Sequence, residues 1–497
     1  MDDLPPAATT IRVRSLLLYA ALALIAILLP ALPWIANLPN VASTYGKSYQ
    51  HFELFGLTGT LALLIAAFVE FRKRGFRSFE DLLPSMLFFL FAFHYLTLVT
   101  EYSIMSWDYI CYENAAHAVL TGANPYEGTG YLYPPLVAQT LALLDRIAVF
   151  GVSATGIDAA ATLTWDGIFY IYQCSQYILM LVTYCMCYRL CLSCGMKRLP
   201  ASIAVAVLLI VNNAVFRTVR HNEVNLWVLD LSLVTILFAR RRPWLGGLSL
   251  ALAANIKLYP VLLFAPLLIT RRYRAVLWSF LGMIALFLAG TDLGRNIEPW
   301  RQFMGLLGAF PKGLAIRDNG VCGIVFNSLE QFGRLLGVSL IKSVFLFRSL
   351  VWAVTLGLVG WFVWRGARRE RAFRLLGGEG QVGERAGWAD LSRLYGHAFD
   401  SMALGLMISP RVWEHHFVLA IPVVLWAVVA RGAENPWKIG IGWFLMLVVP
   451  TFDLYPLSYH RVAGLIILLA LTGAFVNRRT NCKWMWEDGI PRTLESP

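Results

Sequence analysis

The sequence predicts an all-α integral membrane protein with many transmembrane helices. Of its 497 residues, 58% are hydrophobic and only 14% are charged, and the mean hydropathy is +0.61. Apolar runs of about 20 residues, the length that lets an α-helix cross the hydrocarbon core, recur along the chain. These values exclude a soluble globular protein. We expect about twelve transmembrane helices, together with juxtamembrane and re-entrant segments.

The positive charge of the chain is explained by membrane topology. The 42 Lys and Arg residues exceed the 30 Asp and Glu residues by 12, but they lie in short segments between the apolar runs, as they do in cytoplasmic loops. No pattern typical of nucleic-acid binding accompanies them, so nucleic acid is not expected as a partner. The cysteines lack the histidine spacing of a common zinc site, which favours buried free thiols.

The basic loops also predict the orientation. The basic segment 72–77 lies between the second and third apolar runs, which places that loop and the N-terminus in the cytoplasm and the loop around Asp108 outside. For the later basic loops to be cytoplasmic too, residues 135–150 have to lie along the membrane surface. Residues 244–268 then have to enter and leave by the same face, as a re-entrant segment does.

Four regions follow from this topology. Residues 1–105 form a three-span N-terminal region, whose first apolar run lacks the cleavage site of a signal peptide and is retained as an anchor. Residues 106–165 form an external loop with juxtamembrane helices. Residues 166–476 form the transmembrane core, which includes a cytoplasmic loop at 365–397, and residues 477–497 form a cytoplasmic tail.

A carboxylate stands out on the external side. Asp108 follows an apolar run and lies between Trp107 and Tyr109, and an ionisable residue at the edge of a bilayer is a functional-site hypothesis. Asp108 could instead only cap the juxtamembrane helix that is expected to run to about Leu120, because aspartate is a favoured N-cap residue. The alternative carboxylates of this region are Glu101 and Glu113.

A series of motifs, in this order along the chain, resembles glycosyltransferase family 87. The motifs are Asp108-Tyr109, Gly122-Ala123-Asn124-Pro125-Tyr126, Tyr133-Pro134-Pro135-Leu136, Asn222-Glu223-Val224-Asn225, Ala254-Asn255-Ile256-Lys257-Leu258-Tyr259-Pro260 and Ser409-Pro410-Arg411-Val412-Trp413-Glu414-His415-His416-Phe417. The resemblance covers the chain from about Ser106 to Tyr459. It implies the GT-C membrane fold and a polyprenyl-phosphate-mannose-dependent α-1,2-mannosyltransferase. The family often has Gly-Gln-x-Asn where this chain has residues 222–225.

The resemblance implies an inverting transfer of a sugar, expected to be mannose, from a polyprenyl phosphate to a hydroxyl group of a glycolipid or polysaccharide. Asp108 is the expected base, because the acceptor hydroxyl loses a proton while charge develops on the departing phosphate. The expected phosphate-binding residues are cationic: Arg411, His415, His416, Lys257, His221 and Arg461. The expected sugar- or acceptor-binding residues are Trp107, Tyr109, Tyr112, Glu223, Asn225, Glu414 and Asn327.

No metal and no other cofactor is expected, because Arg and His side chains can neutralise the phosphate and the chain has no Asp-x-Asp motif. The main alternative is a secondary transporter or lipid flippase, and a non-catalytic membrane scaffold is a third possibility. The polar residues are expected at one face of the membrane, and the sequence shows no convincing internal repeat. Both observations favour the transferase over a transporter. The expected location is a bacterial plasma (inner) membrane, as a multi-pass protein whose active site faces the exterior or periplasm.

Overall fold

A computed structural model describes residues 79–155, 165–308, 317–375, 384–432 and 434–473. Within these ranges every regular element is a helix, which confirms the predicted all-α class. The first two predicted spans and the predicted cytoplasmic tail lie outside the described residues.

Four helical segments of the described residues are long and apolar enough to cross a membrane. They lie in α7 (Trp165–Ser193), α13 (Tyr273–Gly290), α16 (Val344–Leu375) and the pair η5 (Glu414–Ala420) and α18 (Ile421–Arg431). The bent pair α8 (Arg198–Ile210) and α9 (Asn213–His221) makes a fifth if it is counted as one span. The chain is therefore a polytopic membrane protein, and the number of about twelve spans stays a prediction.

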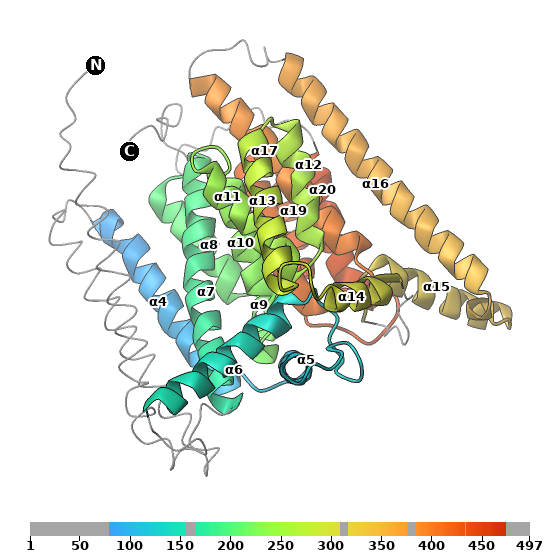
Figure 1. The fold of residues 1–497 in the computed structure, drawn as a ribbon. Helices are drawn as coiled ribbons and strands as arrows, with labels where there is room; N and C mark the ends of the chain where they lie inside the picture. The colour runs from blue at the N-terminus through green and yellow to red at the C-terminus, as the bar shows by residue number, and fades with distance from the viewer. Residues whose placement is uncertain (1–78, 156–164, 309–316, 376–383, 433, 474–497) are drawn as a thin grey trace.

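The remaining described helices are not among these candidate spans. Their bounds are α4 (Phe79–Tyr102), α5 (Trp107–Thr121), α6 (Leu136–Thr155), α10 (Asn225–Phe238), α11 (Pro243–Ile256), η2 (Tyr259–Leu263), α12 (Phe264–Ile269), α14 (Glu298–Gly308), α15 (Val321–Leu336), η3 (Leu340–Lys342), α17 (Glu384–Ile408), α19 (Pro436–Trp443), η6 (Phe444–Val448), η7 (Leu457–Tyr459) and α20 (His460–Thr472). In Figure 1, α5, α6, α14 and α15 gather at the lower end of the upright helices, and α16 runs along one edge.

The break between α8 and α9 is made by one side chain. Asn212 donates to Leu208 O and accepts from Val215 N, both at 3.1 Å, so it satisfies backbone groups of both helices. The two helices are bent by 57° at this point. α9 then ends at Asn222, whose φ of 55° lies in the left-handed region that asparagine tolerates. The turn that follows places Glu223 directly before α10.

Residues 243–269, where the sequence predicts a re-entrant segment at 244–268, form a helical hairpin. Their two ends lie together, because Arg240 Nη1 is 3.9 Å from the Asp390 carboxylate and Arg272 donates to the same carboxylate. Gly247 lets α11 pack closely against α13, since a Cβ there would lie 2.5 Å from Ala275 O. The helical path is interrupted at Lys257, between α11 and η2. The segment therefore leaves and returns at the same end of the bundle.

α5 is a helix where the sequence predicts a juxtamembrane helix up to about Leu120. Its N-cap residue is Ser106, and Asp108 lies inside the first turn. The interpretation of Asp108 as only a cap is therefore wrong. Ser106 Oγ donates to His221 O at 2.5 Å, which ties the start of α5 to the end of α9.

Buried ion pairs fasten α16 at the end of the bundle opposite to α5. Arg365 Nη2 and Arg369 Nη2 each lie 2.9 Å from an oxygen of Asp400 on α17. Arg365 Nη1 also donates to Leu469 O of α20 at 2.6 Å. The shared Asp400 carboxylate and the Leu469 carbonyl thus connect three helices, α16, α17 and α20.

Candidate functional site

Glu223 is the centre of a buried polar cluster. Its side chain is 1% exposed. His415 Nε2 lies 3.1 Å from Oε1, while Tyr112 and Tyr133 donate their hydroxyl hydrogens to Oε2 at 3.1 and 3.3 Å. Lys257 Nζ is 4.0 Å from the same Oε2. An ionised carboxylate only accepts hydrogen bonds, so His415 carries a proton on Nε2.

Asp108 forms a carboxyl pair with Glu223. Burial, the negative charge of Glu223 and a hydrogen bond to Glu223 raise the pKa of Asp108 to about 9, against the effect of Lys257. Burial acts to raise the pKa of Glu223 as well, but His415 and Lys257 hold it well below its usual range. Two carboxyl groups in contact cannot both ionise easily. The pair therefore keeps one proton and one negative charge at neutral pH, with the proton on Asp108.

Lys257 faces the pair from the break in the re-entrant segment. Its Nζ donates to Asn225 Oδ1 at 2.6 Å and lies 4.8 Å from the centre of the Tyr133 ring. His416 Nε2 is 3.2 Å from Lys257 Nζ, and His416 Nδ1 accepts from Trp413 N at 3.1 Å. A neutral His416 therefore carries its proton on Nε2. The ammonium of Lys257 and the Nε2–H of His416 are then two donors that face each other. An anionic oxygen beside them could accept a hydrogen bond from each and so stabilise the arrangement.

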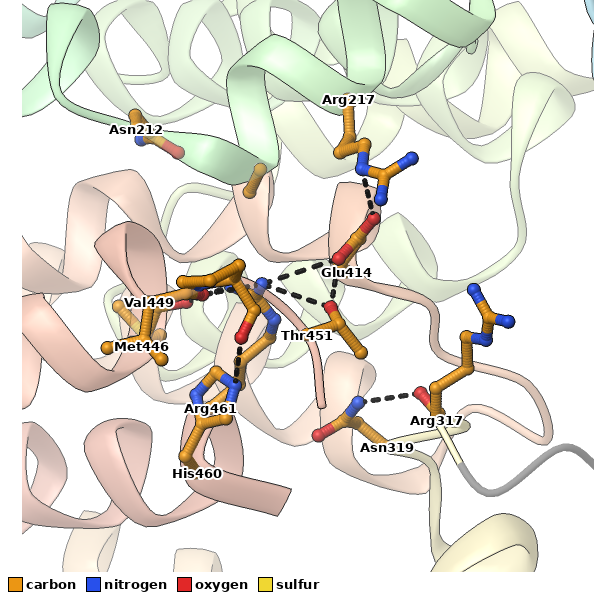
Figure 2. Close-up of polar contacts among 12 residues, drawn as sticks. Asn212, Arg217, Arg317, Asn319, Glu414, Met446, Val449, Thr451, His460 and Arg461 are labelled. Carbon is orange, nitrogen blue, oxygen red and sulfur yellow. Dashed lines mark hydrogen bonds and ion pairs between the residues drawn. The ribbon is translucent and has the colours of Figure 1, made fainter. Parts of the chain in front are cut away.

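The 3₁₀ helix η5 directs three consecutive side chains to three different partners. A 3₁₀ helix has three residues per turn, so successive side chains point about 120° apart. His415 contacts Glu223, and His416 contacts Lys257. Glu414 lies between the guanidinium groups of Arg217 and Arg461, as Figure 2 shows. One turn of η5 therefore connects the carboxyl pair with two separate cationic groups.

Asp318 positions the segment that leads into η5. Its side chain is 1% exposed, and its Oδ1 accepts from Gly320 N at 3.0 Å and from Val412 N at 2.8 Å. Asn319 N donates to Val412 O at 2.7 Å. Burial raises the pKa of Asp318 to about 6, although the two backbone N–H groups and Arg411 oppose that shift. The loop before α15 thus holds the backbone just ahead of η5.

Half of the fourteen expected site residues lie in this cluster. The structure brings together Asp108, Tyr112, Glu223, Asn225, Lys257, His415 and His416.

The other expected site residues lie elsewhere in the site region. Trp107 is 71% exposed, whereas Tyr109 is buried against Phe169 and Tyr172. Asn327 donates to Gly323 O within α15. Arg411 acts on Asp318, and Arg461 is completely buried. His221 accepts from Arg217 in α9. Of the alternative carboxylates, Glu113 lies 4.0 Å from His117 on α5, and the Glu101 side chain lies outside the described residues.

Three residues of the site escaped the sequence analysis. Tyr133 belongs to one of the family motifs but was not among the expected site residues, yet it contacts both Glu223 and Lys257. Gln176 donates to Glu223 O at 3.0 Å from α7. Arg217 binds Glu414 at 2.5 Å. The spacing of Arg217 and His221, four residues apart on one helix face, was the signal that could have identified Arg217.

Among the residues that the structure describes, no group of three or more His, Cys, Asp or Glu side chains is placed to hold a metal ion. Lys257 and His415 lie beside the carboxyl pair and stabilise its negative charge.

Comparisons with known proteins agree with the resemblance seen in the motifs. The sequence model of glycosyltransferase family 87 matches residues 131–378, a shorter region than the motifs cover. A protein of Mycobacterium tuberculosis (strain CDC 1551 / Oshkosh) is 24% identical over 218 residues, which are 42% of this chain and 42% of the relative. A protein of Mycolicibacterium smegmatis (strain ATCC 700084 / mc(2)155) is 28% identical over 247 residues, which are 46% of this chain and 52% of the relative.

Both relatives are named polyprenol-phosphate-mannose-dependent alpha-(1-2)-phosphatidylinositol pentamannoside mannosyltransferases. The chain spans about half or less of the length of these curated relatives. The matched region contains Tyr133, Glu223 and Lys257, which meet in the buried cluster. Over residues 131–378 the chain thus belongs to glycosyltransferase family 87.

Proposed function

We propose that the chain is an inverting membrane glycosyltransferase that moves mannose from a polyprenyl phosphate to a hydroxyl group of a glycolipid or glycan. The observation that carries this proposal is the buried Asp108–Glu223 pair facing Lys257 and two histidines. Membership of family 87 supports the reaction class, and the names of the relatives support the donor. The family does not favour the alternative of a transporter or flippase.

Asp108 acts as the general base in this proposal. Its carboxylate takes the proton of the acceptor hydroxyl while the acceptor oxygen forms a bond to the anomeric carbon. The bond between that carbon and the phosphate oxygen breaks, and its electron pair leaves with the polyprenyl phosphate. Asp108 holds a proton in the free protein at neutral pH, so it has to lose this proton first. Glu223 is a positioning residue that sets the charge of Asp108 and orients His415.

Lys257 and His416 bind the phosphate of the donor. Their donor groups face each other at 3.2 Å, so a phosphate oxygen beside them would accept two charge-assisted hydrogen bonds. Asn225 holds Lys257 through a hydrogen bond of 2.6 Å, and its amide donates to His415 O at 3.3 Å. Because these side chains neutralise the leaving group, the proposed reaction needs no metal ion.

The sugar and the acceptor bind beside the start of α5. Trp107 offers an exposed ring next to Asp108, and aromatic rings pack against the apolar faces of sugars. Tyr112 and Tyr133 line the buried side, with both hydroxyl groups on Glu223. The proposed setting is a bacterial plasma membrane with this site at the external or periplasmic face. The polyprenyl chain of the donor remains in the bilayer.

The experiment that tests the function uses the purified full chain in detergent. It is incubated with polyprenyl-phosphate-mannose and a panel of glycolipid and oligosaccharide acceptors, with and without a chelator, and the products are identified by mass spectrometry. The wild type should transfer mannose in both conditions. Asp108→Asn should be inactive, whereas the control Glu113→Gln on the same helix should remain active. Full activity of Asp108→Asn would refute the assignment of the base. No transfer by the wild type would refute the mannose donor.

A further inference from the structure

A second cationic group surrounds Glu414, the residue before His415 in η5. It consists of Arg217 and His221 on α9, together with Glu414 of η5 and Arg461 of α20. Arg217 Nε is 2.5 Å from Glu414 Oε1, and Arg461 Nη2 is 3.5 Å from Glu414 Oε2. Arg217 Nη1 lies 3.4 Å from His221 Nε2. Figure 2 shows Arg217 and Arg461 reaching Glu414 from different elements.

The charges of this group do not cancel. Two guanidinium groups share the single carboxylate of Glu414, so one positive charge is left over. Arginine stays protonated, and it cannot lose this charge as a lysine or histidine could. A surplus charge beside a membrane surface is costly unless an anion or water meets it. The group is therefore suited to an anionic ligand.

The two arginines have different parts in this group. The Arg461 side chain is 0% exposed, and its guanidinium donates to Met446 O at 2.8 Å, to Val449 O at 2.9 Å and to Thr451 Oγ1 at 3.2 Å. Its two terminal nitrogens are thus held by the residues around it, and Nη2 also contacts Glu414. The Arg217 side chain keeps 33% of its surface exposed. Arg217 is therefore the arginine that a ligand can reach.

His221 is the second side chain of this group that could donate to a ligand. Arginine can only donate hydrogen bonds, so the contact with Arg217 makes His221 Nε2 an acceptor and leaves the proton of a neutral imidazole on Nδ1. The backbone of His221 is fixed by Ser106 at the start of α5, two residues before Asp108. The cationic group is therefore connected to the start of α5, which carries Asp108. Within η5, Glu414 and His416 point about 120° apart, so this group and Lys257 lie in different directions from η5.

We propose that Arg217 and His221 form a second phosphate subsite, with Glu414 and Arg461 as positioning residues. The inference rests on the proposed function, since the phosphate belongs either to the polyprenyl donor or to an anionic glycolipid acceptor. A planar guanidinium with a neighbouring N–H donor matches the oxygens of a phosphate. The site thus has two phosphate contacts, one at Lys257 and one at Arg217.

The first arm of the test measures binding without catalysis. The full chain in detergent is titrated with decaprenyl phosphate and, separately, with decaprenol, which has the same chain and no phosphate. If the donor supplies the phosphate, Arg217→Gln should weaken the binding of decaprenyl phosphate at least about tenfold, because a charge-assisted hydrogen bond is lost. Arg217→Lys keeps the charge and should lose less. The matched control is Arg220→Gln, an exposed arginine of the same helix.

The second arm measures transfer to two acceptors, an alkyl mannoside and the same mannoside carrying a phosphate group. If the acceptor supplies the phosphate, Arg217→Gln should raise KM for the phosphorylated acceptor at least about tenfold and leave KM for the neutral one unchanged. A change in either arm supports the subsite and identifies its ligand. Wild-type behaviour of folded Arg217→Gln and Arg217→Lys in both arms would overturn it.

The two proposals can fail separately. If the wild type transfers mannose but both Arg217 variants behave like it, only the second subsite is wrong. If the wild type transfers no sugar, the binding arm still decides whether Arg217 holds a phosphate. If the wild type neither transfers sugar nor binds decaprenyl phosphate more tightly than decaprenol, both proposals are overturned.

Discussion

His415 Nε2 lies 3.1 Å from Glu223 Oε1, although the two residues are far apart in the sequence. His415 belongs to η5, and Glu223 lies in the turn before α10. This contact keeps Glu223 ionised, and an ionised Glu223 makes it harder for the neighbouring Asp108 to lose its proton. The state of the expected base is therefore set by a residue on another part of the chain. The effect should be visible in the pH dependence of catalysis.

The raised pKa of Asp108 predicts that kcat/KM rises with pH through the neutral range, since kcat/KM reports ionisations of the free enzyme. Glu223→Gln removes the neighbouring negative charge. The pKa of Asp108 should then fall, and the rise in kcat/KM should begin at lower pH, even if the plateau is also lower. Glu113→Gln should leave the profile unchanged. Identical profiles for Glu223→Gln and wild type would show that the pair is not the titrating group.

Lys257→Gln tests the proposed binding of the donor phosphate. Glutamine can still donate to Asn225 Oδ1 but carries no charge, so KM for polyprenyl-phosphate-mannose should rise at least about tenfold. Steady-state kinetics with varied donor measure this, and thermal unfolding checks that the fold is retained. The control is Lys342→Gln, an exposed lysine of η3. If Lys257→Gln lowers the stability but leaves KM for the donor unchanged, Lys257 stabilises the fold and does not bind the donor phosphate.

The chemistry of the site was predictable where a charged residue interrupts an apolar pattern. Asp108 and Lys257 stand out in the sequence for this reason, and both lie in the cluster. Tyr133 could not be identified in the same way, because its partner Glu223 is distant in the sequence and tyrosine beside proline is typical of a turn. Glu223 was expected to bind sugar, and its contact with Asp108 depends on how α5 lies across the bundle.

The fold was predictable to a similar extent. Loop charge predicted that residues 244–268 enter and leave by the same face, and the two ends of this helical hairpin lie together at Asp390. Hydropathy could not show where a span is broken. The apolar run through α8 and α9 is bent by 57° at Asn212, where a single side chain replaces the backbone hydrogen bonds of a continuous helix. Such breaks are decided by local hydrogen bonding rather than by average polarity.

Arg461→Met should destabilise the protein strongly. The buried guanidinium bonds the backbone of η6 and the loop after it, and its loss would leave these carbonyl groups unpaired. Breaking a buried ion pair costs about 3 to 5 kcal/mol in the free energy of unfolding. Arg431→Met removes an exposed pair with Glu434 and should cost less than about 1 kcal/mol. Denaturant titration in detergent compares the free energies of unfolding of the two variants. A similar small loss of stability in both would contradict the role of Arg461 as a positioning residue.

The orientation of the chain predicts opposite labelling at two exposed leucines. Leu293, between α13 and α14, is 75% exposed, and Leu375, at the end of α16, is 81% exposed. On a background without native cysteines, Leu293→Cys should react with a membrane-impermeant maleimide added to intact cells. Leu375→Cys should react only after permeabilisation, because the basic loop that follows α16 is expected in the cytoplasm. The reverse pattern would place Asp108 and the whole cluster on the cytoplasmic side, where the proposed external donor and acceptor could not reach it.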